Sequence, residues 1–99
     1  MWYAILSEDA SGNLARRGSA RPAHVQRLEE LKQHGRLLVA GPHPAIDAPV
    51  PGAAGYSGSL VIADFASLGE AQAWADTDPY MAAGVYARVA VKPFLKTLP

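Results

Sequence analysis

The order of the apolar segments restricts the fold of this chain more than any other feature. Four short segments are rich in aliphatic and aromatic residues, and two segments with helical character separate the first from the second and the third from the fourth. The apolar segments are residues 2–7, 36–40, 60–63 and 85–92. The order strand–helix–strand–strand–helix–strand is that of a ferredoxin-like βαββαβ sandwich, an α+β fold with both helices on one face of an antiparallel sheet. We predict this fold in a single domain over residues 1–99, because that length has no room for a second domain.

The first helix is expected to begin near Pro22. Proline suits the first helical turn because its missing N–H would have no partner there. Val25, Leu28 and Leu31 recur at three-residue spacing and form one apolar stripe. Gly35 is expected to end the helix as a C-terminal cap.

Two segments lack regular patterning and are expected to be loops. Residues 8–20 show little periodicity, and residues 43–57 contain several prolines and glycines. Gly41 and Pro42 are expected to end the second strand. Long loops in small domains often carry function, and residues 8–20 and 44–50 are candidates for lining a pocket.

The second helical segment has a clear start signal. Ser67 followed three residues later by Glu70 matches a capping box. Asp78 and Pro79 interrupt this helix and are suited to begin a further short turn, with Asp78 as its cap.

The predicted sheet has more apolar surface than two helices cover. Residues 2–7 and 60–63 are apolar on both faces, whereas the last strand alternates. In that strand, Val85, Ala87, Val89 and Val91 share one face, and Tyr86, Arg88, Ala90 and Lys92 share the other. An uncovered apolar sheet face marks an interaction site, so we predict a homodimer in which two sheets pack face to face.

Composition excludes several classes of protein. Nine basic and nine acidic residues cancel, so the chain lacks the basic excess that nucleic-acid binding needs. No apolar run approaches the roughly 18 residues of a membrane span. The absence of cysteine removes disulfides, thiol nucleophiles and cysteine-based zinc sites. The N-terminus lacks the pattern of a signal peptide, so a cytoplasmic location is expected.

Several short motifs, taken together, resemble the bacterial YciI proteins over nearly the whole chain. They are Arg21-Pro22-Ala23-His24, Gly35-Arg36-Leu37-Leu38, Ala40-Gly41-Pro42, Gly52-Ala53-Ala54-Gly55-Tyr56, Gly58-Ser59, Ala71-Gln72-Ala73-Trp74-Ala75, Asp78-Pro79-Tyr80, Ala83-Gly84-Val85-Tyr86 and Val91-Lys92-Pro93-Phe94. The resemblance implies a dimeric α/β barrel built from ferredoxin-like subunits, with a site centred on His24 and Asp78. One activity associated with this family is dehydrochlorination of a chlorinated aromatic diol or triol by such a His–Asp pair.

His24 and Asp78 are therefore the candidate catalytic residues. In the predicted first turn, the helix dipole disfavours a charged His24 ring, which suits a general base. Asp78 would fix the ring tautomer and stabilise the charged form. Without the resemblance, ordinary roles at helix starts are the better explanation of both residues, and the resemblance reverses this preference. Asp76 is the competing carboxylate, but it points to a different helix face, and the cap position favours Asp78.

Four arginines are candidates for binding an anion. Arg16, Arg17 and Arg21 precede the predicted helix start, where they could bind a carboxylate, phenolate or phosphate together with free N–H groups. For Arg16 and Arg17, the alternative that they are solvated surface residues explains the sequence at least as well. Arg88 is predicted on the open sheet face, where it would bind a ligand or lie at the rim of the dimer interface.

Ser59 and Tyr80 complete the candidate binding residues. The Ser59 hydroxyl could donate to a ligand oxygen, although it has no nucleophile elbow around it, and Tyr80 could offer its phenol to the pocket. His24 and His34 are ten residues apart, about 15 Å along a helix, too far to share a metal. A site that combines His43 with the His–Asp pair lacks the ligand spacing of zinc proteins, so no metal is predicted.

These residues favour a small cofactor-independent enzyme that uses His24 and Asp78 for acid–base chemistry. Elimination or isomerisation of a small anionic or phenolic substrate fits the groups present. The alternative is a non-catalytic dimer that binds a small ligand or another protein through the same pocket. A third hypothesis, an oxygenase that handles haem or a quinone, is supported only by analogy with other proteins of this fold.

Overall fold

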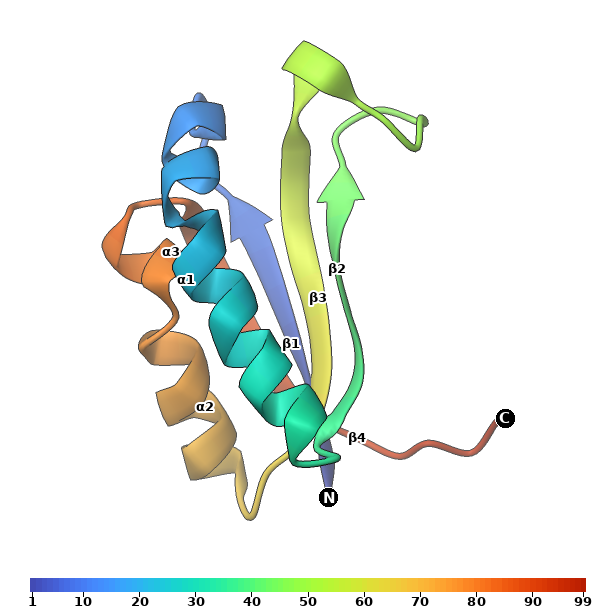
Figure 1. Ribbon diagram of the computed structural model, residues 1–99. Coiled ribbons are helices and arrows are strands. Elements are labelled where there is room, and N and C mark those ends of the chain that lie inside the picture. Colours follow the sequence, from blue (N-terminus) through green and yellow to red (C-terminus); the bar gives the residue numbers. More distant parts are fainter.

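The computed structural model describes residues 1–99 and contains one four-stranded antiparallel sheet with its helices on one face (Figure 1). The strand order is β2-β3-β1-β4, so the two central strands are the first and third in sequence. This is the predicted ferredoxin-like α+β fold, which dimeric α/β-barrel proteins use as their subunit. The elements are β1 (Trp2–Asp9), α1 (Leu14–Gln33), β2 (Leu37–Pro44), the 3-10 helix η1 (Gly52–Ala54), β3 (Tyr56–Asp64), α2 (Leu68–Asp76), α3 (Pro79–Ala82) and β4 (Tyr86–Phe94).

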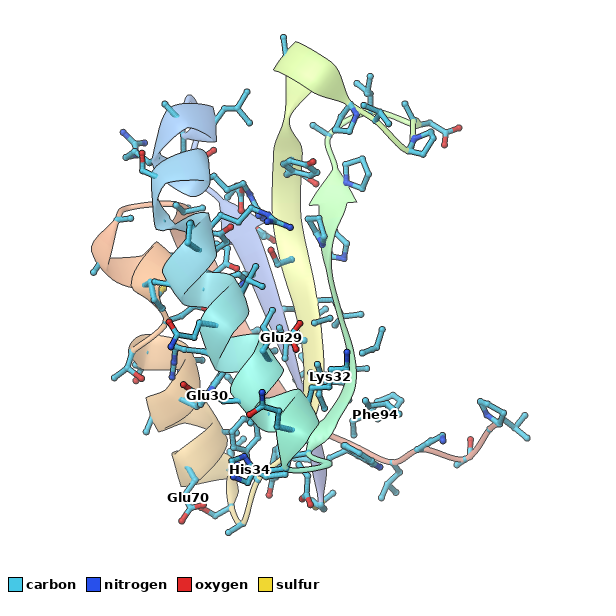
Figure 2. The ribbon with its side chains drawn as sticks, viewed as in Figure 1. Glu29, Glu30, Lys32, His34, Glu70 and Phe94 are labelled. Atoms are coloured by element: carbon cyan, nitrogen blue, oxygen red, sulfur yellow. The ribbon has the colours of Figure 1, made fainter.

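The core lies between the sheet and the two longer helices. Alternate residues of the central strands point to this side, because side chains alternate along a strand. The core comprises Tyr3, Ile5, Leu31, Val61, Ala63, Phe65, Ala71 and Ala75. Polar side chains such as Glu30, His34 and Glu70 lie on the outer surface of the helical layer (Figure 2). No helix is long and apolar enough to cross a membrane.

The first helix begins earlier than the sequence pattern predicts. It starts at Leu14, two turns before Pro22, and β1 extends to Asp9, so the prediction that residues 8–20 form a loop is correct only for residues 10–13. Proline inside a helix costs about 3 kcal/mol in model systems. Tertiary contacts of the first turn offset this cost, since Arg17 forms a buried ion pair with Asp9, and the Asn13 amide donates to the carbonyl of Val85.

The strands on either side of the proline-rich segment are longer than predicted. β2 continues through Gly41 and Pro42 to Pro44, and β3 begins at Tyr56, so only the middle of residues 43–57 is irregular. β2 is an edge strand, and edge strands tolerate proline because one side of their ladder is unpaired.

Both predicted N-terminal helix caps are confirmed. The Ser67 hydroxyl accepts a hydrogen bond from the N–H of Glu70 at 3.1 Å. Asp78 Oδ1 accepts from the N–H of Tyr80 at 2.9 Å, and Pro79 occupies the first position of α3.

A β-bulge changes the direction of one side chain in β4. The register with β1 shifts between Glu8, which pairs with Arg88, and Asp9, which pairs with Tyr86. A bulge places one extra residue in one strand, so the simple alternation fails there. Tyr86 therefore lies on the helix side, with its ring 5.4 Å from that of Tyr80, and the prediction that it shares a face with Arg88 is wrong.

The face of the sheet opposite the helices is not covered by the chain. Leu6 in β1 and Val39 in β2 are 39% and 47% exposed on this side. Leu60, Trp2 and Phe94 belong to the same face by strand register and are half-buried.

Candidate active site

His24 and Asp78 form a buried pair that joins α1 to the start of α3. The ring nitrogen Nδ1 of His24 lies 2.9 Å from Asp78 Oδ1 and 3.0 Å from Oδ2. Exposure of the two residues is only 7% and 5%. His24 lies in the third turn of α1, so the predicted effect of the helix N-terminus on its ring does not apply, since that effect fades within the first turn.

Tyr80 fixes the plane of the His24 ring. The two rings are stacked with centroids 3.9 Å apart and planes 10° apart. Asp78 holds both partners, because it accepts from the Tyr80 N–H as well as facing Nδ1. An ionised carboxylate only accepts hydrogen bonds, so Nδ1 carries the proton in the neutral ring and Nε2 is left as the basic nitrogen.

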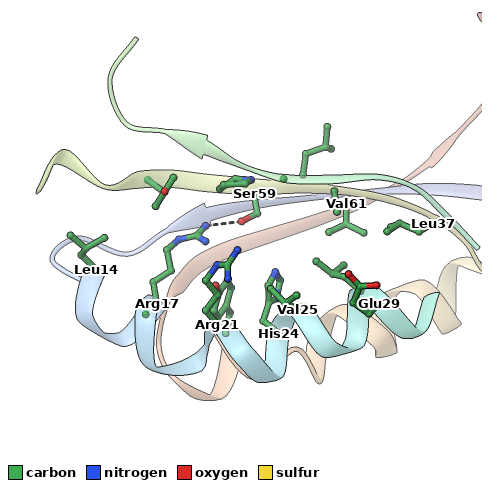
Figure 3. A pocket seen from close by; sticks show the side chains of 17 residues that line it. Leu14, Arg17, Arg21, His24, Val25, Glu29, Leu37, Ser59 and Val61 are labelled. Carbon is green, nitrogen blue, oxygen red and sulfur yellow. Dashed lines mark hydrogen bonds between the residues drawn. The ribbon is translucent and has the colours of Figure 1, made fainter. Parts of the chain in front are cut away.

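The remaining nitrogen of His24 faces a cavity between α1 and the sheet (Figure 3). The cavity has a volume of about 410 Å³, in the range of small-molecule sites. Its walls come from α1, β2, β3 and α3, and nine of its seventeen lining residues are hydrophobic. The apolar part is formed by residues such as Val25, Leu28, Leu37 and Val61, and the polar part by Arg17, Arg21, Ser59 and Tyr80.

Arg17 is a central residue of this site. Its Nε donates to Asp9 at 3.0 Å, and its Nη2 donates to the Ser59 hydroxyl at 2.7 Å and the Gly58 carbonyl at 3.0 Å. Burial lowers the pKa of Arg17, but the hydrogen bond to Asp9 and the Asp9 charge outweigh it and leave the pKa raised. Glycine is required at position 58, since a Cβ there would lie 2.0 Å from the Ser7 carbonyl oxygen. Arg17 is therefore a fixed cation rather than the solvated surface residue that the sequence favours.

The two tyrosines beside the pair remain neutral at physiological pH. Burial raises the pKa of Tyr86 to about 12, although hydrogen bonding with Ser59 partly opposes this rise. Burial also raises the pKa of Tyr80, and the Arg17 charge partly opposes it. Both phenols can therefore donate a hydrogen bond but do not act as bases near pH 7.

Most of the predicted site residues come together, and Arg88 does not. Ser59, Arg21 and Tyr80 line the same cavity as His24. Arg88 lies on the opposite face of the sheet, where it is exposed and paired with Glu8. The competing carboxylate Asp76 is exposed and accepts a hydrogen bond from the Gln72 amide, as its position on another helix face predicts.

The remaining histidines lie away from the cavity. His34, at the end of α1, bonds the carbonyl of Glu30, and His43 is exposed on β2. No group of three or more His, Cys, Asp or Glu side chains is close enough to hold a metal ion.

The importance of Arg17 was missed because the helix start was misplaced. Arg17, Arg21 and His24 are spaced by four and three residues, which places them on one face of a helix. This alignment appears in the sequence only when the helix is extended through Pro22. No local sequence pattern identifies Asp9 and Tyr56 as residues that contact Arg17.

The fold and the site define a class of protein, namely ferredoxin-like α+β proteins with a buried His–Asp pair at a cavity between helix and sheet. The family model of the YCII-related domain matches residues 1–95, and the chain belongs to that family. The resemblance predicted from the sequence motifs is thus confirmed.

Named relatives share most of the sequence. The chain is 59% identical over 96 residues to Protein YciI of Escherichia coli O6:H1 and, equally, of Shigella flexneri, covering 97% of this chain and 98% of theirs. An uncharacterized protein of Haemophilus influenzae is 50% identical with the same coverage.

A solved structure with the same fold belongs to an enzyme. It is the 5-chloro-2-hydroxyhydroquinone dehydrochlorinase of Burkholderia phenoliruptrix, in complex with 2,5-dihydroxybenzoquinone. The TM-score is 0.83 and the sequence identity 27%, over 96% of this chain and 94% of that one. In that relative, the same fold carries out chemistry on a small aromatic molecule.

Proposed function

We propose that this protein is a small enzyme in which His24 acts as general base and acid, positioned by Asp78. The observation that carries the proposal is the orientation of His24, whose Nδ1 is held by Asp78 while the other side of the ring faces the cavity. A histidine in this arrangement accepts a proton at Nε2, and the Asp78 carboxylate stabilises the imidazolium that forms.

The proposed substrate is a small anionic or phenolic compound. The cavity combines apolar walls with the cationic Arg17 and Arg21, a combination that suits an aromatic ring bearing ionised oxygens. The related dehydrochlorinase is named for a chlorinated trihydroxybenzene, which belongs to this chemical class.

Elimination of HCl is the reaction that fits these groups best. His24 takes the proton of a substrate hydroxyl and returns it to the chlorine-bearing ring carbon, so that a first carbonyl forms and this carbon becomes tetrahedral. His24 then takes the proton of a second hydroxyl, whose electron pair forms a second carbonyl while the adjacent C=C electrons shift and expel chloride. One proton and one chloride ion leave, so the step needs no oxidant or reductant. Isomerisation by proton removal and return at a second atom uses the same groups.

The proposal is tested by measuring chloride release from 5-chloro-2-hydroxyhydroquinone. We expect turnover by the wild-type protein and a loss of kcat of about 10²-fold or more in His24→Gln and in Asp78→Asn, in line with the usual contribution of acid–base catalysis. Asp76→Asn is the matched control, because Asp76 is an exposed carboxylate two residues away that does not contact His24.

Two other results would contradict the proposal. Equal turnover in the wild type and the His24 variant would exclude the acid–base role. Tight ligand binding with no turnover of any chlorinated or isomerisable phenol would favour the alternative, a non-catalytic ligand-binding protein. That alternative gains some support from Asp78, whose capping of α3 is a structural role independent of catalysis.

We also propose that the functional form is a homodimer joined through the open sheet face. The exposed Leu6 and Val39 and the half-buried Leu60 give this face apolar side chains that the chain itself leaves uncovered. A second copy provides a surface of the same shape and chemistry, as two-fold interfaces require. Arg88 and Glu8 would then lie at the polar rim of this interface.

A further inference from the structure

Arg27 is a half-buried arginine on α1 that does not line the cavity. It follows His24 by three residues, so the two side chains leave the same face of the helix about one turn apart. A ligand bound in the cavity does not meet Arg27. This arginine can therefore affect the candidate site only through the protein groups that it contacts.

The guanidinium of Arg27 binds the C-terminal end of α2. Its Nη2 donates to the carbonyl of Trp74 at 2.9 Å and to the hydroxyl of Thr77 at 3.0 Å. Its Cζ lies 4.3 Å from the centroid of the Trp74 ring. A cation in this place also suits the negative end of the α2 dipole. These contacts fix the end of α2 against α1 at the residue directly before Asp78.

Asp78 continues from this fixed end of α2. Its N–H donates to the carbonyl of Ala75 at 3.2 Å, so its main chain extends the hydrogen bonding of the helix. Its carboxylate then lies 2.9 Å from Nδ1 of His24 on α1. Arg27 and His24 therefore hold the two ends of one short segment, residues 74–78, against neighbouring turns of α1. A shift of this segment changes the direction from which the carboxylate meets the ring.

Arg27 also brings a positive charge close to Asp78 without pairing with it. It forms no direct ion pair, and its Nη1 is buried without a hydrogen-bond partner. Burial lowers the pKa of Arg27, while the charges of Asp78 and Glu30 partly oppose this. The attraction between two charges is mutual, so Arg27 favours the ionised form of the Asp78 carboxylate. That form accepts the hydrogen of Nδ1.

We propose that Arg27 is a positioning residue for the His24–Asp78 pair, which fixes the end of α2 and favours the ionised carboxylate so that Asp78 faces Nδ1 of the ring. This inference rests on the proposed function, because it concerns the same pair. Arg27 is not itself catalytic, since it does not reach the cavity. Its loss weakens the orientation of the pair and has little effect on the binding of a ligand.

The test is the ¹⁵N NMR spectrum of the His24 ring in Arg27→Met, which removes the charge and the donors but keeps an unbranched side chain. At a pH where the ring is neutral, we expect the share of the Nε2–H tautomer to rise by roughly threefold or more, the effect of weakening one hydrogen bond. Arg27→Lys keeps the charge and a donor group, and we expect it to restore part of the wild-type preference for Nδ1–H.

Arg36→Met is the matched control, because Arg36 makes similar contacts that involve neither Thr77 nor Asp78. Its Cζ lies 5.3 Å from the centroid of the Phe65 ring, and its Nε donates to a main-chain carbonyl at 3.0 Å. We expect both methionine variants to unfold at a lower temperature, but only Arg27→Met to change the tautomer. Amide NMR spectra check folding, and Arg27→Gln, which also removes the charge, replaces Arg27→Met under the same expectation if that variant does not fold.

Three results would overturn the positioning role of Arg27. They are a wild-type tautomer ratio in Arg27→Met, the same loss of preference in Arg27→Lys as in Arg27→Met, and an equal change in Arg36→Met. Each would show that the tautomer does not depend on the contacts and charge of Arg27.

Chloride release separates this inference from the proposed function. We expect Arg27→Met to lower kcat by roughly tenfold, less than loss of the base itself, and to leave KM nearly unchanged. If the tautomer depends on Arg27 but no substrate is turned over, the positioning role stands and the enzymatic proposal alone fails. If turnover needs His24 and Asp78 but Arg27→Met keeps both the tautomer and kcat, the inference on Arg27 alone fails.

Discussion

At the scale of single residues, one carboxylate organises the candidate site. Asp78 caps α3 through the Tyr80 N–H and faces Nδ1 of His24 in α1. Tyr80 in turn stacks on His24 and lies beside Arg17. The base, its orienting group and the cation are thus linked through Asp78 and Tyr80, so a change at Asp78 disturbs the orientation of the whole group.

Buried tyrosines make stability fall at alkaline pH. Burial raises the pKa of Tyr86 to about 12 and raises that of Tyr80, compared with about 10 in an unfolded chain. Between these values the unfolded chain loses phenolic protons that the folded chain keeps, so the free energy of unfolding decreases as pH rises from about 10 towards 12. Urea unfolding at pH 9 and pH 11 is expected to show this loss, with a smaller loss in Tyr86→Phe. An equal loss in that variant would contradict the assignment to Tyr86.

At the scale of elements, the sequence predicts well the helix boundaries that local contacts set, and poorly those that tertiary contacts set. Ser67, Asp78 and Pro79 act through neighbouring backbone groups, so their pattern alone locates α2 and α3 correctly. The start of α1 depends instead on Arg17, whose partners Asp9 and Ser59 come from two different strands. No local pattern reports such partners, and this part of the fold and site was therefore not predictable.

Replacement of Pro22 tests how α1 is stabilised. Pro22→Ala is expected to raise the free energy of unfolding by about 1–3 kcal/mol, because it restores an N–H donor in the helix interior and removes a steric clash. Ala23→Gly is the matched control, also at an exposed helix position. It is expected to lower the free energy of unfolding by about 1 kcal/mol. Thermal or urea unfolding measures both. A destabilised Pro22→Ala would show instead that the packing of α1 depends on the proline.

At the scale of the whole molecule, the fold class and the placement of both helices on one sheet face were predictable because they follow from the order of apolar segments. The β-bulge in β4 next to Glu8 was not predictable, because the alternation along β4 gives no sign of the extra residue that turns Tyr86 to the helix side. The apolar character of the open face was visible in residues 2–7 and 60–63, and Leu6 is indeed exposed there. This face is the basis of the proposed dimer.

Charged substitutions on the two sides of the sheet test the dimer. Leu6→Asp places a charge in the open face and is expected to reduce the mass in solution from that of two chains to that of one. Leu68→Asp is the matched control, since Leu68 is similarly exposed but lies on α2 in the helical layer. Light scattering after size exclusion gives both masses. A monomeric wild-type protein, or dissociation by the Leu68 change alone, would rule out the sheet-face dimer.

The role of His24 as a base oriented by Asp78 is tested most directly by ¹⁵N NMR of its ring. At a pH where the ring is neutral, we predict the tautomer with hydrogen on Nδ1, which faces Asp78, and a basic Nε2. Addition of 2,5-dihydroxybenzoquinone should shift the Nε2 signal, and Asp78→Asn should abolish the strong preference for this tautomer. An Nε2–H tautomer in the wild type, or an Nε2 signal that does not respond to the ligand, would contradict the proposed mechanism.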